Sequence, residues 1–198
     1  RNESSAASDV YKRQVSINAL EMESNPAGIG VYAFVDLFGY ALEGEADFAG
    51  GSYDFTFDNP ISSIGPINFV WGRASYSVTL KKNLMDVSIP FLAEAALNAG
   101  AGFGNHRSTP RASVSMVEEL FGDDLTSVDA LGEGMENKLV TYLEDNLIEA
   151  RGVHLQGGLR FKLLMLDTHL NLRYTIAENV YDGSSGFMQM IFKTGFAF

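Results

Sequence analysis

The sequence predicts an all-β chain, an antiparallel up-and-down transmembrane β-barrel with about eight strands and a helical insertion in one outer loop. Three observations lead to this fold class. Apolar and polar residues alternate with a period of two along most of the chain. Several alternating segments exceed the usual strand of about 5–6 residues and reach the roughly 9–11 that a tilted membrane strand needs. The connections between them alternate between short and long, as they do in membrane barrels.

The N-terminal residues stand apart from this pattern. Residues 4–14 match the translation of an oligonucleotide adapter used in transposase-based sequencing libraries. We therefore expect residues 1–14 to be an artefact without ordered structure, and we assign the barrel to residues 15–198. Because Val15 falls inside an alternating segment, we also expect a truncated chain, with a signal peptide and further strands missing before it.

The first four expected strands carry an apolar row on one face and a mixed or polar row on the other. In the second of them, the apolar row runs from Ile29 to Leu37 and the other row contains Asp36. In the third, three aromatic residues alternate with small polar and acidic ones, and the fourth alternates serine and threonine with apolar residues. These strands are 15–22, 29–42, 52–58 and 74–80.

The last four expected strands show the same period more clearly. In the sixth, Leu159 and Phe161 belong to the apolar row, whereas Arg160 and Lys162 belong to the polar row. These strands are 85–97, 153–165, 169–176 and 187–198. Tight turns are expected at Leu42–Glu45, Lys81–Asn83 and Leu166–Thr168, and longer connections at 23–28, 58–66, 99–152 and 177–186.

The stretch 99–151 interrupts the period of two and is expected to be an insertion between strands. It begins with a glycine-rich segment, Gly100–Arg107, that predicts a flexible loop. The periodicity then predicts helices over Ser113–Phe121 and Glu136–Ala150, with Gly122 and Gly152 as their stops. Such an insertion could fold inward as a plug, lie across the mouth as a lid, or pack as a passive cap.

Composition excludes several classes of function. The net charge is −11, which argues against a nucleic-acid partner because phosphate binding needs clustered lysine and arginine. The chain has no cysteine, so disulfides, thiol catalysis and zinc–cysteine sites are excluded. The histidines His106, His154 and His169 fall in no metal-binding motif, and no nucleophile elbow is present. We therefore expect no catalytic residue, no metal and no cofactor.

The C-terminus carries a specific resemblance. It ends Lys193-Thr194-Gly195-Phe196-Ala197-Phe198, and Phe196 and Phe198 share a face with Met188, Met190 and Phe192. This end resembles the C-terminal signal that the barrel-assembly machinery reads in outer-membrane barrels, although Gly195 lies closer to the end than usual and Thr194 interrupts the apolar row. The segment 157–164 is similar to the penultimate strands of poorly characterised outer-membrane barrel proteins. The resemblance implies a location in the bacterial outer membrane, with the bilayer and the assembly machinery as partners.

The polar row of a membrane barrel must face its interior. Placing Arg160, Lys162 or Arg173 toward lipid would cost roughly 2–4 kcal/mol each near mid-bilayer. The alternation instead predicts that these side chains face the lumen together with other charged and polar residues. The expected lumen-facing set is Asp36, Asp86, Glu94, His154, Gln156, Arg160, Lys162, His169, Asn171, Arg173 and Lys193.

Three functions are compatible with this pattern. The leading expectation is porin- or transporter-like passage or binding of small solutes through a polar lumen. The second is a structural or adhesion barrel with a packed interior. The third is a soluble β-barrel that binds an apolar ligand, in which the apolar row would turn inward and the polar row would face water.

Overall fold

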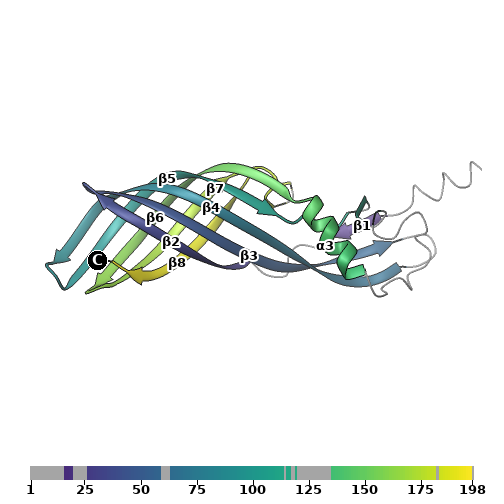
Figure 1. Cartoon of the computed structure of the whole chain (residues 1–198), viewed down its shortest axis with the longest axis horizontal. Coiled ribbons are helices and arrows are strands. Elements are labelled where there is room, and N and C mark those ends of the chain that lie inside the picture. Colours follow the sequence, from purple (N-terminus) through teal and green to yellow (C-terminus); the bar gives the residue numbers. More distant parts are fainter. Residues whose placement is uncertain are drawn as a thin grey trace, which may run out of the picture. The chain divides into compact units, whose positions relative to one another are not determined.

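The computed structural model describes residues 16–19, 26–58, 63–113, 115–116, 119, 135–181 and 183–197. The expected artefact 1–14 and the terminal Phe198 of the expected assembly signal lie outside this part of the chain. The described residues are mostly β-structure, with the helix α3 at Met135–Asp145 (Figure 1). No helix in these ranges is long and apolar enough to cross a membrane.

Eight strands form one antiparallel sheet, and each strand from β2 onward pairs with the next along the chain. The short β1 pairs with β3, on the same side of it as β2. The strands are β1 Ser16–Ala19, β2 Ala27–Leu37, β3 Tyr40–Asp58, β4 Ser63–Ile89, β5 Ala93–Ser108, β6 Ile148–Leu163, β7 Leu166–Ile176 and β8 Gly186–Phe196.

The chain divides into two compact units. The first, which we call the sheet unit, comprises Gly28–Phe48, Arg73–Ser108 and Ile148–Phe198. The second comprises the described parts of 1–27, 49–72 and 109–147. In this second unit the Tyr53 and Phe69 rings pack edge to face, 5.7 Å between centroids, and the Ala112 amide donates to the Tyr53 hydroxyl at 2.7 Å.

The sheet unit has an inverted distribution of polarity. In β7, Asp167, Asn171 and Thr175 are at most 1 % exposed, whereas Leu170 and Leu172 are 41 % and 56 % exposed. The same alternation runs through β6 and β8. One face of the sheet is therefore enclosed and polar, and the other is apolar and open. The soluble-barrel alternative requires the reverse of this arrangement.

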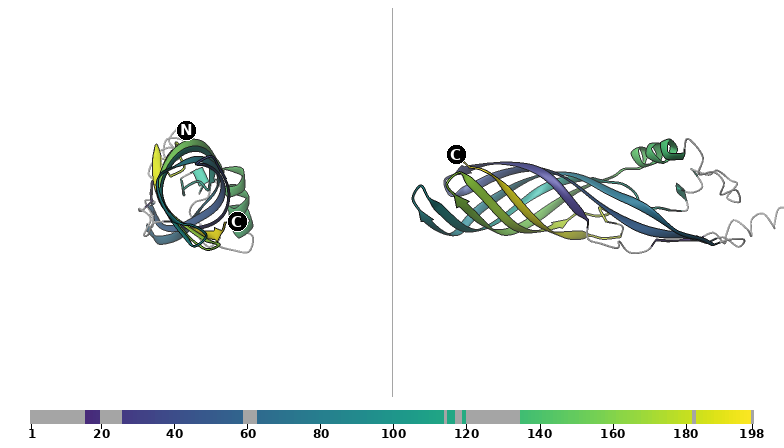
Figure 2. Two further views of the ribbon diagram at one scale, coloured as in Figure 1. Left: turned by 90° about the vertical axis from the view of Figure 1, so that its left-hand side faces the viewer. Right: turned by 90° about the horizontal axis from the view of Figure 1, so that it is seen from below.

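The sheet curls round its polar face. Side chains of β2 reach those of distant strands: Tyr32 contacts His169 of β7, and Asp36 pairs with Arg160 of β6. A Cβ added at Gly195 of β8 would lie 2.7 Å from the Tyr32 hydroxyl oxygen. Figure 2 shows the strands of the sheet unit winding round a common axis. Within the described residues the sheet is not closed by a pairing of β2 with β8.

The short connections of the sheet unit lie at the end where β8 finishes. Leu166, the first residue of β7, pairs with Phe196, and Leu163 pairs with Ala93 at the start of β5. The chain reverses there at Phe38–Gly39, at 90–92 and at Leu164–Met165. At their other ends, β5 and β6 are joined through residues 109–147, and β7 and β8 through residues 177–185.

Several expected boundaries were wrong. Residues 42–45 and 81–83 are not turns but lie inside β3 and β4, and 85–97 is not one strand because it contains the turn at 90–92. The turn expected at 166–168 falls two residues earlier. The physical reason is that the real turns place Phe38, Phe91 and Leu164 at positive φ, a conformation that their residue types do not signal.

The insertion is also shorter than expected. Gly100–Arg107 is not a loop but part of β5, and Gly152 lies inside β6. The second helix ends at Asp145 rather than Ala150, and β6 begins at Ile148. The connection therefore spans 109–147. Most of the helix expected at 113–121, with its stop Gly122, lies outside the described residues, and the role of the insertion as plug, lid or cap stays a prediction.

Candidate functional site

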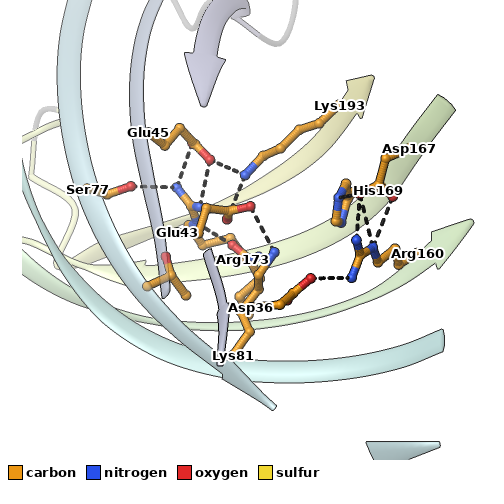
Figure 3. A network of polar contacts seen from close by, with 12 residues as sticks. Asp36, Glu43, Glu45, Ser77, Lys81, Arg160, Asp167, His169, Arg173 and Lys193 are labelled. Atoms are coloured by element: carbon orange, nitrogen blue, oxygen red, sulfur yellow. Dashed lines mark hydrogen bonds and ion pairs between the residues drawn. The ribbon is translucent and has the colours of Figure 1, made fainter. Parts of the chain in front are cut away.

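The enclosed face of the sheet unit holds a network of ion pairs centred on Glu43 (Figure 3). Glu43 lies on β3 and is fully buried. Its Oε2 accepts a hydrogen bond from Lys81 Nζ of β4 at 2.8 Å, and its Oε1 accepts one from Lys193 Nζ of β8 at 2.8 Å. One carboxylate thus joins the neighbouring strand to the far edge of the sheet. Because both of its oxygens are used, the buried negative charge is fully paired.

Glu45, the next inward residue of β3, repeats this arrangement. Arg173 of β7 holds it with two parallel hydrogen bonds, NH1 to Oε1 at 2.9 Å and NH2 to Oε2 at 3.0 Å. Such a bidentate pair is directional and roughly twice as strong as a neutral hydrogen bond. Lys193 also pairs with Glu45. Two further donors of Arg173 bind Gln156 Oε1 at 2.8 Å and Ser77 Oγ at 3.3 Å.

A second cluster surrounds Arg160 of β6. Its Nε and NH2 donate to Asp167 of β7 at 3.0 and 2.8 Å, and its NH1 donates to Asp36 of β2 at 3.1 Å. The guanidinium carbon also lies 4.9 Å from the centroid of the Phe34 ring. Charge and π-contact together hold the guanidinium against β2. The Asp36–Arg160 pair, like the Glu43–Lys193 pair, joins strands that are not neighbours in the sheet.

An apolar cluster packs against the enclosed face where β7 ends and β8 begins. Phe187 and Val180 are at most 9 % exposed and belong to one apolar cluster, with Tyr181 packed against it. Arg73 lies 5.0 Å from the Phe187 ring centroid and donates to Asp47 at 2.7 Å and to the Tyr181 hydroxyl at 3.3 Å. Burial raises the pKa of the Tyr181 phenol, Arg73 opposes this shift, and Asp47 adds to it.

The three histidines are buried in this interior, and each contacts a different polar residue. His154 Nε2 lies 2.8 Å from Thr79 Oγ1, and His106 Nδ1 lies 2.9 Å from Ser75 Oγ. His169 Nε2 lies 3.4 Å from Asp167 Oδ2. Each ring therefore has a different polar partner. Across the described ranges, no group of three or more histidine, cysteine or acidic side chains is placed to hold a metal ion.

Inward-facing glycines make room for these side chains. Gly102 of β5 faces the His154 ring, and an added Cβ would lie 2.7 Å from His154 Nε2 and would also clash with the Val78 carbonyl oxygen. A Cβ at Gly100 would lie 2.8 Å from Lys81 Cγ. The glycine-rich run is therefore part of a strand, and its missing side chains leave room for the side chains of Lys81 and His154 on the adjacent strands. We call these inward-facing glycines the glycine stripe.

Most of the residues expected to face the lumen lie on the enclosed face. Asp36 joins the Arg160 cluster but its side chain is half exposed. Asp86 and Glu94 share the face of the network, since they pair with Ala96 and Lys162, yet Asp86 is exposed because it lies on the β4–β5 hairpin near its turn. The residues that are buried are His154, Gln156, Arg160, His169, Asn171, Arg173 and Lys193.

Sequence reasoning missed the acidic and basic partners of this network. The sequence predicts turns at 42–45 and 81–83, and this prediction leaves Glu43, Glu45 and Lys81 out of the expected lumen-facing set. The signal was present: Ala41, Glu43, Glu45 and Asp47 occupy every second position and alternate with Leu42 and Phe48. Arg73, on the neighbouring β4, lies on the same enclosed face.

Some buried polar atoms have no partner within the described protein. Neither side-chain atom of Asn171 is hydrogen-bonded, and the hydroxyl of Thr175 and both ring nitrogens of His169 are likewise unsatisfied by hydrogen bonds. Because buried polar groups are nearly always satisfied, we expect ordered water beside β7. The interior thus combines tightly paired charges with a strip of polar atoms along β7 that hydrogen-bond to no described residue.

No protein-family model, curated protein or solved structure matches this chain.

Proposed function

We propose that this chain is a β-barrel of the bacterial outer membrane whose interior is sealed by its own side chains and which anchors the polypeptide in the bilayer. One observation carries the proposal: the sheet unit exposes its apolar rows and encloses its charges. Leu155, Phe161 and Met190 are 66 %, 50 % and 76 % exposed, whereas Glu43, Arg173 and Lys193 are 0 %, 3 % and 6 % exposed. A contiguous apolar surface of this kind marks a surface that is covered by lipid or protein.

Lipid is the covering that fits all strands at once. The exposed rows run along β6, β7 and β8, whose lengths of 16, 11 and 11 residues suit tilted membrane strands of about 9–11 residues. Each fully covered leucine or phenylalanine contributes about 1.5–3 kcal/mol. Turning Arg160 or Arg173 outward would cost roughly 2–4 kcal/mol at mid-bilayer. The polarity of the two faces therefore favours a bilayer.

A membrane-spanning sheet must also close, because lipid offers no partner for the backbone groups of an open edge. The contacts of Tyr32 with His169 and of Asp36 with Arg160 bring β2 close to the opposite edge of the sheet. With alternating antiparallel neighbours, β2 and β8 run in the same direction. We therefore propose a closed barrel whose seam is a parallel contact between these two strands.

The ion pairs favour a sealed interior over an open pore. Small barrels are filled by their own side chains. Here the pairs Glu43–Lys193, Glu45–Arg173 and Asp36–Arg160 join β3 to β8, β3 to β7 and β2 to β6, strands that are not neighbours in the sheet. The network pairs as many acids as bases, so it leaves little net charge to select ions. An anchoring or structural role fits this interior better than the solute passage first expected from the sequence.

Reconstitution tests the membrane assignment. The chain has no cysteine, so one introduced cysteine carries one fluorophore. A bimane label on Leu172→Cys, in the exposed row of β7, is expected to be quenched by lipids with brominated acyl chains. The same label on Ser185→Cys, in the exposed connection before β8, is expected to be unaffected. A chain that stays in solution without detergent and shows no quenching at position 172 would exclude the proposal.

Planar-bilayer recording tests the seal. We expect the unmodified full chain to insert without steady conductance. Stable open channels at all applied voltages would contradict a sealed interior and would favour porin-like passage of small solutes.

A further inference from the structure

The apolar face of the sheet unit is hollowed at the end that carries the long connections. The hollow is a groove of about 550 Å³. Its floor and sides come from three neighbouring strands: Phe103, Val153 and Ile176 form one row across β5, β6 and β7, and Tyr76 of β4 borders it. Phe103 and Val153 are 64 % and 58 % exposed. The groove is thus an open apolar trough on the face that we propose to meet lipid.

A polar edge borders this trough. Arg151 and Asn105 also line the groove, and they face each other across β6 and β5. Asn105 Nδ2 donates to the Tyr76 hydroxyl at 2.8 Å, which fixes the amide beside the trough. Arg151 is exposed, and in the described part of the chain it has no ion-pair partner. Its neighbour Arg107, in contrast, is paired with Glu149 at 2.8 Å.

The guanidinium of Arg151, unpaired among the described residues, lies beside an apolar trough and is free to bind an anion. At a membrane boundary such side chains extend toward the headgroup region and pair with phosphate. Arginine suits phosphate because its planar fork offers two parallel hydrogen bonds. The trough beside Arg151 supplies the apolar contacts that a lipid tail attached to that phosphate requires. The combination therefore selects an amphipathic anion over a free ion.

We propose that this groove binds one anionic phospholipid, with its phosphate on Arg151 and an acyl chain along Phe103, Val153 and Ile176. This inference rests on the proposed membrane barrel, because the groove meets lipid only if the apolar face does. Asn105 and the Tyr76 hydroxyl would contact the polar part of the glycerol ester region.

Native mass spectrometry of the detergent-solubilised full chain tests the site. The probes are dioleoyl phosphatidylglycerol and dioleoyl phosphatidylcholine, which share acyl chains and differ in headgroup charge. We expect the unmodified chain to retain one phosphatidylglycerol at concentrations where phosphatidylcholine is not retained. Arg151→Gln should weaken this retention about tenfold, whereas Arg107→Gln, at the paired arginine nearby, should leave it unchanged.

A second variant probes the trough itself. Val153→Trp fills the groove and should also remove the retained lipid while the outer face stays apolar. Equal retention of both lipids, or retention that survives both Arg151→Gln and Val153→Trp, would overturn the proposal. The proposed membrane barrel is tested separately. If that proposal is wrong, brominated lipid will not quench the label at position 172.

Discussion

Lys193 Nζ of β8 donates to Glu43 Oε1 of β3 at 2.8 Å, although 150 residues separate them in the chain. The same carboxylate holds Lys81. Both lysines are at most 6 % exposed, so each ammonium depends on a carboxylate for its charge to be tolerated. Glu43 is consequently the residue on which the interior of the sheet unit depends most.

The first prediction concerns this residue. Glu43→Gln keeps the shape of the side chain but removes its charge and leaves Lys81 without a carboxylate partner. Breaking a buried pair from one side costs about 3–5 kcal/mol of unfolding free energy. The measurement is urea unfolding in detergent, followed by far-ultraviolet circular dichroism.

A matched control is available on the outer face. Glu149 pairs with Arg107 at 2.8 Å, but the two side chains are 58 % and 59 % exposed. Exposed pairs contribute about 0–1 kcal/mol, so Glu149→Gln should be nearly neutral. Equal losses from the two variants would show that Glu43 does not pair in a buried interior.

The second prediction concerns the glycine stripe. Gly102→Ala places a Cβ against the Val78 carbonyl oxygen and the His154 ring, which should destabilise the sheet by about 1–3 kcal/mol through overpacking. Gly44→Ala is the control, because a Cβ there meets nothing within 4 Å. Thermal unfolding of both variants in the same detergent gives the comparison. A neutral Gly102→Ala would mean that His154 and Val78 do not approach β5 as closely as described.

How far the sequence predicts this fold is clearest in β6 and β7. Every second residue is apolar or glycine over 153–163 of β6 and apolar over 170–176 of β7. The faces of Leu159, Arg160, Leu170 and Arg173 follow directly from this period of two. The pattern is strong because both faces are uniform over these two stretches. The all-β class and the antiparallel sheet were predictable for the same reason.

The turns were less predictable because their residues carry no turn signal. Phe38, Phe91 and Leu164 all adopt positive φ, between 53° and 64°, where glycine, asparagine and aspartate are usual. In their absence, Gly100–Arg107 was the strongest loop signal, although it belongs to β5. The partners in the ion-pair network could not be predicted either, since pairs such as Asp36–Arg160 depend on how the sheet curls.

The third prediction concerns the seam between β2 and β8. If the two strands touch in parallel, a cysteine at outward-facing Ala33 should form a disulfide with a cysteine placed at one of the outward β8 positions Met190, Phe192 or Thr194. Moving the β2 cysteine from Val31 to Val35 should move the best β8 partner toward the C-terminus. Non-reducing electrophoresis of lipid-reconstituted double variants gives the readout. Absence of any cross-link, or a shift in the opposite direction, would indicate another strand between the edges or no seam.

The last prediction concerns the turn tips at the end where β8 finishes. Phe91 is fully exposed at positive φ, a conformation that costs a non-glycine residue roughly 1–2 kcal/mol. Burying its side chain in lipid would contribute about 1.5–3 kcal/mol and would outweigh that cost. We therefore expect a bimane label on Phe91→Cys to be quenched by lipids brominated near the headgroup and protected from aqueous iodide. Ser88→Cys lies on the polar face of the same hairpin and should show the opposite behaviour. If iodide quenches both labels equally, the tip lies in water and its apolar residues need a protein partner instead.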